Sequence, residues 1–213
     1  MPNPLKSKFV QYKSPQNTDN NNTICNLRRN VYMKATGIVR RIDDLGRIVI
    51  PKEIRKTFHI KESDPMEIFI NGEGEIVLKK YSLMGEMPSF AKQYAESLAQ
   101  ATGHVAVITD RDTVVAVAGG LKNISGKRVS KELEDAMQAR SMCLAAKGSS
   151  EFISIVEDLQ EDVSDVAVGT ILAAGDIAGS VCLLNTKGLT EFGEVEKKLI
   201  QAATGFIGRQ LES

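Results

Sequence analysis

The fold of the first part of the chain is decided by the stretch MKATGIVRRIDDLGRIVIPKEIRK, which occupies residues 33–56. Residues 36–42 read as one β-strand, and Ile48 and Ile50 alternate with their neighbours as in a second strand. The four residues at 43–46, Asp-Asp-Leu-Gly, have the composition of a turn. The stretch therefore predicts a β-hairpin.

The residues that follow extend this hairpin into a compact β-rich unit. Pro51 stands where a helix can begin because its missing N–H costs nothing there, and two helical turns over 52–59 fit the sequence after it. Two more strands are expected at 66–70 and 76–78, joined by a turn that opens with Asn-Gly. The unit spans 33–81.

This unit is close to the smallest size at which a chain can build its own core. About 50 residues without a disulfide framework or a metal site bury too little apolar surface for a stable independent domain. Association of copies is the remaining route to stability. We therefore expect two copies to complete one shared core.

The second half of the chain predicts an α+β domain with an antiparallel sheet. After a connector at 82–88, helices and strands follow in the order α-β-β-α-β-β-β-α, and hairpin signals rather than long crossovers separate the strands. The expected helices lie at 89–102, at 130–140 and near the C-terminus, and the expected strands at 104–109, 113–118, 152–156, 166–174 and 177–184. We assign 89–213 to this domain.

Residues 1–32 differ from both parts in composition. They are rich in Asn, Lys, Ser and Pro, contain few apolar residues and show no periodicity. Such a composition cannot offset chain entropy by burial, so we expect a disordered extension. Met33 is then the expected start of the folded protein.

Several classes of protein are disfavoured by the composition. No apolar run is long enough to span a membrane and the first residues contain no apolar signal segment, so no membrane partner is expected. The three cysteines, Cys25, Cys143 and Cys182, lack metal-ligand spacing, which favours a reducing cytoplasm without disulfides, metal or cofactor. No catalytic motif is found, and the two histidines fall in different predicted domains. An enzyme is not expected.

Basic residues concentrate in the first predicted unit. The chain as a whole has 27 basic and 27 acidic residues, but residues 34–56 hold seven basic and three acidic ones. These side chains collect on the hairpin and on one face of the short helix, where Arg can contact phosphates or guanine edges: Arg40, Arg41, Arg47, Lys52, Arg55 and Lys56. The pattern suggests double-stranded DNA as a partner. The alternative is a solvated basic face with ion pairs to Asp43, Asp44 and Glu53.

Two apolar stripes in the second domain suggest a surface for self-association. One lies on the first helix of that domain and one on its last helix, and together they could form a helical bundle with another copy: Phe90, Tyr94, Leu98, Val195, Leu199, Ala202 and Phe206. The alternative is that both helices bury only against their own sheet. If the two units associate with different partners, the protein is a homotetramer.

The stretch 33–81 closely resembles the AbrB-type transition-state regulators. The resemblance is carried by the quoted stretch and by Pro65-Met-Glu-Ile-Phe and Ile76-Val-Leu-Lys-Lys-Tyr. It implies a swapped-hairpin β-barrel that dimerises and binds DNA, with DNA-contacting arginines at Arg40, Arg47 and Arg55. Lys56 departs from the family, where Arg is common, and a Lys ammonium lacks the planar fork with which Arg makes bidentate contacts.

Residues 82–213 resemble the GAF-type domain of a family of sporulation regulators. The stretches that carry this resemblance are Phe90-Ala-Lys-Gln-Tyr, Gly193-Glu-Val-Glu-Lys-Lys and Ala203-Thr-Gly-Phe-Ile-Gly-Arg-Gln. It implies a regulator, activator or repressor, of late spore-specific genes, located on the nucleoid of the forespore. A small-molecule ligand is possible for a GAF-type domain, but no residue identifies one.

Two other functions remain open at this point. Toxin–antitoxin systems reuse the AbrB-type fold, but their antitoxins usually end in a disordered tail, which is replaced here by a periodic, globular sequence. A GAF-type small-molecule sensor without a DNA role is the second alternative. A DNA-binding regulator of sporulation is the function that the sequence favours.

Overall fold

The computed structural model describes residues 36–62, 64–72, 74–186, 188 and 191–212. The described residues up to Pro51 belong to one compact unit, and those from Lys52 onward belong to a second. The expected extension over 1–32 lies outside the described residues. The domain boundaries that the sequence predicts near 81 and 89 both fall inside the second unit.

The turn predicted at 43–46 is present in the first unit. The N–H of Gly46 donates to the carbonyl of Asp43 at 3.0 Å, and the N–H of Asp43 donates to the carbonyl of Arg47 at 3.1 Å. Gly46 has a φ of 75°, a value that glycine adopts without strain. The prediction of the turn is confirmed.

The strands predicted on either side of this turn are absent from the single chain. Residues 36–42 and 47–50 form no strand ladder, and Gly37 has a φ of 69°, outside the extended region. Their large apolar side chains are exposed, as Val39 is at 84% and Val49 at 71%. Strand hydrogen bonds need a partner along the whole ladder. The expectation of two paired strands is therefore wrong for one copy of the chain.

The second unit begins with a short helix and a two-stranded sheet. Helix α1 spans Lys52–Thr57, strand β1 spans Met66–Ile70 and strand β2 spans Ile76–Lys80. Strands β1 and β2 are antiparallel, with Ile68 opposite Leu78 and Ile70 opposite Ile76. The predicted helix and both predicted strands are confirmed, with β2 two residues longer than expected.

A five-stranded antiparallel sheet forms the centre of the remaining chain. The strand order is β4-β3-β7-β6-β5, and every neighbouring pair is antiparallel. The strands are β3 (Val105–Thr109), β4 (Val114–Ala118), β5 (Cys143–Ala146), β6 (Asp165–Ala173) and β7 (Asp176–Asn185). The α+β class predicted from the sequence is confirmed.

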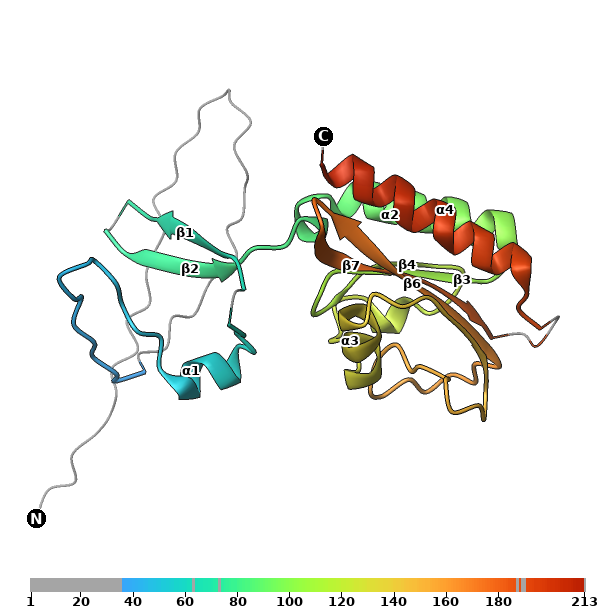
Figure 1. Cartoon of the computed structure of the whole chain (residues 1–213), viewed down its shortest axis with the longest axis horizontal. Helices are drawn as coiled ribbons and strands as arrows, with labels where there is room; N and C mark the ends of the chain where they lie inside the picture. Colours follow the sequence, from blue (N-terminus) through green and yellow to red (C-terminus); the bar gives the residue numbers. More distant parts are fainter. Residues whose placement is uncertain (1–35, 63, 73, 187, 189–190, 213) are drawn as a thin grey trace, which may run out of the picture. The chain divides into compact units, whose positions relative to one another are not determined.

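Helices cover both faces of this sheet (Figure 1). Helices α2 (Pro88–Thr102) and α4 (Glu194–Leu211) lie side by side on one face, and helix α3 (Lys131–Gln138) lies on the other. Two single turns of 3₁₀ helix, η1 (Met84–Glu86) and η2 (Lys122–Ile124), complete the elements.

Each face of the sheet has its own apolar core. Ile108, Ile171 and Leu183 point toward α2 and α4, whereas Val107 and Cys182 point toward α3. Successive side chains of a strand point to opposite faces, so a sheet covered twice needs an almost continuous apolar run. This explains why β3 reads as such a run in the sequence.

One strand of the sheet lies elsewhere than expected. The sequence predicts a strand at 152–156, but that segment is irregular, and β5 at Cys143–Ala146 takes its place. Ile155 and Val156 are nevertheless 0% and 1% exposed. The carbonyl of Ile155 accepts a hydrogen bond from the N–H of Ser130 at 2.9 Å instead of joining a ladder. The apolar run therefore reports burial rather than strand pairing.

Candidate nucleic-acid interface

The turn of the first unit presents the first three basic side chains. Arg40, Arg41 and Arg47 are all exposed. The carboxylate of Asp43 accepts from the Nε of Arg47 at 2.8 Å and from its N–H at 2.7 Å. The backbone N–H and the side chain of Arg47 together lower the pKa of Asp43 below its ordinary value. Asp43 thus holds the turn in shape and orients Arg47.

Helix α1 presents the other three basic side chains. Lys52, Arg55 and Lys56 are exposed and share one side of the helix. The helix ends in a Schellman motif: His59 has a φ of 51°, and the N–H of Ile60 donates to the carbonyl of Arg55 at 2.8 Å. Ile54 is half-buried, whereas Phe58 is 63% exposed and is not covered by the single chain.

The two basic sets therefore belong to different compact units. Arg40, Arg41 and Arg47 lie in the first unit, and Lys52, Arg55 and Lys56 lie in the second. Of the acidic partners expected for a merely solvated basic face, Asp43 forms its ion pair, with Arg47. The side chain of Arg47 remains 69% exposed in that pair, so its guanidinium is accessible to a phosphate.

An aromatic cluster lies on α2 and α4. The ring of Tyr94 stacks on the ring of Phe206 with centroids 5.6 Å apart, and Phe90 lies 6.0 Å from Tyr94 and 6.2 Å from Phe206. Phe206 is nevertheless 44% exposed and Val195 67% exposed. Burial raises the pKa of Tyr94. We call Phe90, Tyr94 and Phe206 the aromatic cluster.

The other residues expected at the oligomer surface divide between the core and the exterior. Leu98 is 7% exposed and packs in the core below α2, so the structure removes it from an interface with another copy. Ala202 is exposed and Leu199 is half-buried. The side of α4 that faces the sheet is instead formed by Ile200, Ala203 and Ile207.

Three further observations concern possible metal ligands, helix lengths and a thiol in the part of the chain that the structure describes. Among these residues no group of three or more His, Cys, Asp or Glu side chains could hold a metal ion. None of the described helices is long and apolar enough to cross a membrane. Complete burial raises the pKa of the Cys182 thiol to about 12, so this thiol stays protonated at neutral pH.

Comparison with protein families gives two matches in tandem. The model described as "Stage V sporulation protein T C-terminal, transcription factor" matches residues 86–212. The model described as "Antidote-toxin recognition MazE, bacterial antitoxin" matches residues 39–84. The two matches meet at residues 84–86, within the connector that the sequence predicts at 82–88.

Similar proteins support the same division. Stage V sporulation protein T of Bacillus subtilis (strain 168) is 48% identical over 181 residues, which cover 84% of this chain and 99% of that protein. Transition state regulatory protein AbrB of the same strain is 55% identical over 51 residues, 24% of this chain and 52% of that protein. The expected likeness to AbrB-type regulators is confirmed.

A solved structure identifies the fold of the larger domain. The GAF domain of an Acinetobacter phosphoenolpyruvate-protein phosphotransferase superposes with a TM-score of 0.51 at 12% sequence identity. The match covers 62% of this chain and 84% of that domain. At this identity the likeness shows the fold, and the predicted GAF-like fold is confirmed.

Proposed function

Because the chain belongs to the stage V sporulation protein T family of transcription factors, and is thus a regulator rather than an enzyme, we propose that it binds double-stranded DNA with loose sequence preference to control late, spore-specific genes. The observation that carries this proposal is the exposed basic set on the turn and α1, in the segment most similar to AbrB. We assign it to the nucleoid of the forespore cytoplasm, as activator or repressor according to the gene.

The proposed contacts combine phosphate binding with shape recognition. Arg40, Arg47 and Arg55 are the arginines expected to contact DNA, and Arg41, Lys52 and Lys56 add charge beside them. Cationic side chains release counterions from DNA, which supplies much of the affinity without selecting a sequence. Loose specificity then follows from groove shape and deformability rather than from a base code.

The experiment compares two triple variants of equal charge. Replacing Arg40, Arg47 and Arg55 with Ala should abolish operator binding and flatten the salt dependence, by about 0.9 in the log–log slope for each phosphate that is no longer neutralised. The control replaces Lys92, Lys147 and Lys198, which are exposed on the larger domain. Equal weakening in both variants would show that only the net charge of the protein matters. Normal DNA binding by the arginine variant would refute the site.

We propose that the basic module, residues 33–81, dimerises by exchanging hairpins. The apolar side chains of residues 38–49 and of β1 and β2 are exposed in one copy, including Ile42 at 66% and Ile70 at 76%. A two-stranded ribbon with an uncovered apolar face is not stable alone in water. A second copy supplies both the missing strand partners and the cover, and it brings two basic sets to one stretch of DNA.

The aromatic cluster supports a second, separate interface. The three rings contact one another, with Tyr94 and Phe206 stacked, and stay partly exposed, so they are better suited to contact between copies than to water. If the module forms one contact between copies and the aromatic cluster with Val195, Leu199 and Ala202 forms another, with different partners, the assembly is a tetramer. Such a tetramer has two dimeric DNA-binding modules. Light scattering on the full chain at micromolar concentration tests this, and a mass no larger than a dimer would exclude it.

The GAF-like domain, residues 89–213, is proposed as a sensor joined through the connector at 82–88. The GAF-like fold of this domain is the basis on which a small-molecule ligand is proposed. In this chain the α3 face of the sheet is filled by large side chains such as Leu133 and Ile155, both 0% exposed. A ligand there would have to displace them.

An antitoxin role has one observation in its favour, the family match over 39–84. In that role the segment after the module would bind a toxin. Here that segment is a folded domain with two apolar cores. Co-purification of a small toxin with the full chain would revive this alternative.

A further inference from the structure

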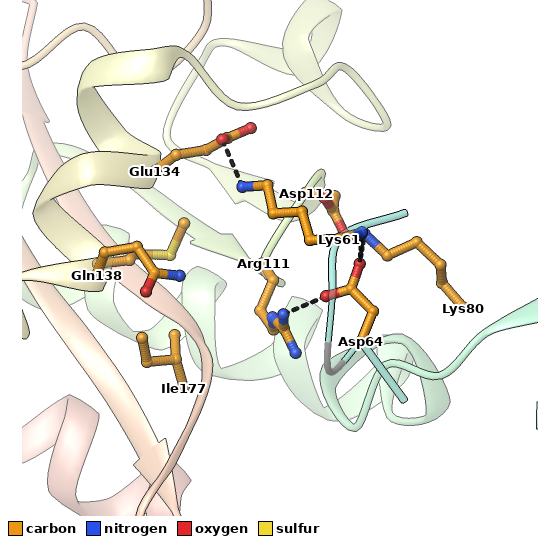
Figure 2. Close-up of a pocket in the computed structure, with 9 residues that line it drawn as sticks. Lys61, Asp64, Lys80, Arg111, Asp112, Glu134, Gln138 and Ile177 are labelled. Atoms are coloured by element: carbon orange, nitrogen blue, oxygen red, sulfur yellow. Dashed lines mark hydrogen bonds and ion pairs between the residues drawn. The ribbon is translucent and has the colours of Figure 1, made fainter. Parts of the chain in front are cut away.

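Charged side chains gather where the part of the basic module in the second unit meets the sensor domain (Figure 2). The module contributes the loop after α1 and the end of β2, and the sensor contributes the β3–β4 turn, the segment just before α3, and α3 itself. The members are Lys61, Asp64 and Lys80 from the module and Arg111, Asp112, Arg128 and Glu134 from the sensor. We call them the junction cluster.

Three ion pairs of this cluster join the module to the sensor. Arg111 contacts Asp64 at 2.5 Å, Lys61 contacts Glu134 at 2.9 Å, and Lys80 contacts Asp112 at 2.6 Å. The connector adds a fourth contact, because the hydroxyl of Ser82 donates to Asp110 at 3.0 Å. Residues far apart in sequence therefore fix one docked arrangement.

The two acidic centres of the cluster are shielded from water. The side chain of Asp64 is 0% exposed and that of Glu134 is 9% exposed. Burial alone would raise both pKa values, but the N–H of Lys61 with Lys80 and Arg111 lowers the pKa of Asp64, and Arg128 with Lys61 lowers that of Glu134. Removing one partner from an ion pair with a buried member costs more than removing one from an exposed pair, because the remaining charge is less hydrated.

Each buried carboxylate holds one cation from its own part and one from the other. Asp64 keeps Lys80 of the module at 3.1 Å in addition to Arg111 of the sensor. Glu134 keeps Arg128 of the sensor at 2.9 Å in addition to Lys61 of the module. Opening the junction therefore leaves both carboxylates paired and newly hydrated. Such an arrangement can open and close without leaving an isolated buried charge.

Helix α3 connects this cluster to the interior of the sensor. Its residues Leu133 and Met137 are buried in the core on one face of the sheet, while Glu134, between them, binds Lys61. The hydroxyl of Ser130 caps the helix by accepting from the N–H of Leu133 at 3.1 Å, and it donates to the carbonyl of Ser154. A change in the core or in the 154–156 loop therefore moves Glu134.

We propose that the junction cluster is an ionic lock that docks residues 52–81 of the module on the sensor, and that α3 opens or closes it in response to the sensor's core. The docking itself is independent of the proposed function. Its consequence for DNA binding rests on that function, because the lock fixes where α1 and its basic side chains can reach.

Hydrogen exchange on the full chain tests the lock without DNA. The variant Lys61→Met, Arg111→Gln, Asp112→Asn removes one member of each joining pair, yet Asp64 retains Lys80 and Glu134 retains Arg128. Exchange should become roughly tenfold faster or more at 59–65 and 110–113, as expected when partly buried pairs are removed. The control, Lys92→Met, Lys147→Met, Asp162→Asn, makes the same charge change in exposed pairs away from the cluster.

Unchanged exchange at both segments in a folded triple variant would overturn the lock. If that variant fails to fold by circular dichroism, Lys61→Met alone gives the answer at 59–65, because Lys61 is half-exposed and Glu134 keeps Arg128. Absence of DNA binding by the unmodified protein would refute the proposed function and leave this result intact.

A second variant tests the role of α3. Ser130→Ala removes the cap and should speed exchange at the start of α3 and also at 59–65. The control is Ser97→Ala, whose hydroxyl donates to the carbonyl of Gln93 on the exposed side of α2. Faster exchange in α3 with no change at 59–65 would overturn the transmission step.

Discussion

The same substitution at two glycines of α4 should change stability in opposite directions. Gly205 faces solvent, and a Cβ added there would meet only a terminal nitrogen of Arg209, at 3.9 Å. Gly208, three residues later, faces the sheet, and its added Cβ would lie 2.2 Å from the carbonyl oxygen of Leu172 in β6. The first site has room for a methyl group and the second has none.

The magnitudes follow from these distances. Ala is favoured over Gly inside a helix by about 0.5–1 kcal/mol, so Gly205→Ala should stabilise the sensor by about that amount. At Gly208 the contact is with a backbone atom that cannot turn away, so α4 must move off β6 by roughly 1 Å, and overpacking of this kind costs about 1–3 kcal/mol. After the helix gain is deducted, Gly208→Ala should destabilise by up to about 2.5 kcal/mol.

Urea unfolding followed by far-ultraviolet circular dichroism measures both variants, since the chain has no tryptophan. The protein concentration must be equal in all samples because association shifts the apparent stability. Movement of α4 also shifts Phe206, so Gly208→Ala should weaken self-association as well. Equal stabilisation by both substitutions would refute the described packing of α4 on β6.

Four further outcomes are expected. The pKa values of Asp64 and Glu134 lie below their ordinary values of 3.8 and 4.5. The protection from hydrogen exchange that the two ionised carboxylates give at 59–65 should therefore be complete above about pH 4.5 and disappear as the pH falls through the lowered pKa values. In a Cys25→Ser variant, iodoacetamide should modify the half-buried Cys143 well before the fully buried Cys182, as measured by mass spectrometry. His59→Gly should stabilise the end of α1 by about 1 kcal/mol, because a left-handed conformation costs a side chain that much, and thermal unfolding measures it. Replacing both Ile70 and Ile76 with Ser should lower the molar mass of the assembled full-length protein, as measured by light scattering, because it removes apolar surface from the proposed interface. Replacing Glu67 and Lys79 with Ser, on the opposite face of the ribbon, should leave that mass unchanged.

Local patterns predicted the elements whose partners lie close in sequence. The turn at 43–46, the ribbon of β1 and β2 and the two long strands of the sensor all have neighbours within a few residues. For such hairpins the alternation of side chains and the turn residues contain the needed information. The same reasoning misplaced β5, because burial of an apolar run at 155–156 is not specific to a strand.

Features that depend on distant residues were not predictable in this way. The acidic residues Asp64 and Asp112 read only as turn residues, and Glu134 as one charge on a helix. Their partners across the junction are far away in sequence, 47 residues for Asp64 with Arg111 and 73 residues for Glu134 with Lys61, and nothing in a local window pairs them. Leu98 shows the same limit, since its helical spacing fits an outer stripe and an inner core equally well. Which face of a helix meets the sheet is fixed by the whole fold.

The failure of the strands at 36–42 and 47–50 has a different cause and points to the assembly. Their sequence is typical of strands, but one copy of the chain offers them no ladder and leaves Val39 84% exposed. On the proposed dimer, the partner copy completes both the ladder and the core, so folding of the turn and pairing of copies become one equilibrium. The arginines on either side of that turn then reach their DNA-binding geometry only in the assembled protein. The apparent affinity for DNA should therefore rise with protein concentration until all the protein is dimeric. Linking two dimers through the aromatic cluster should raise the affinity further, because the second module then binds at a high effective concentration.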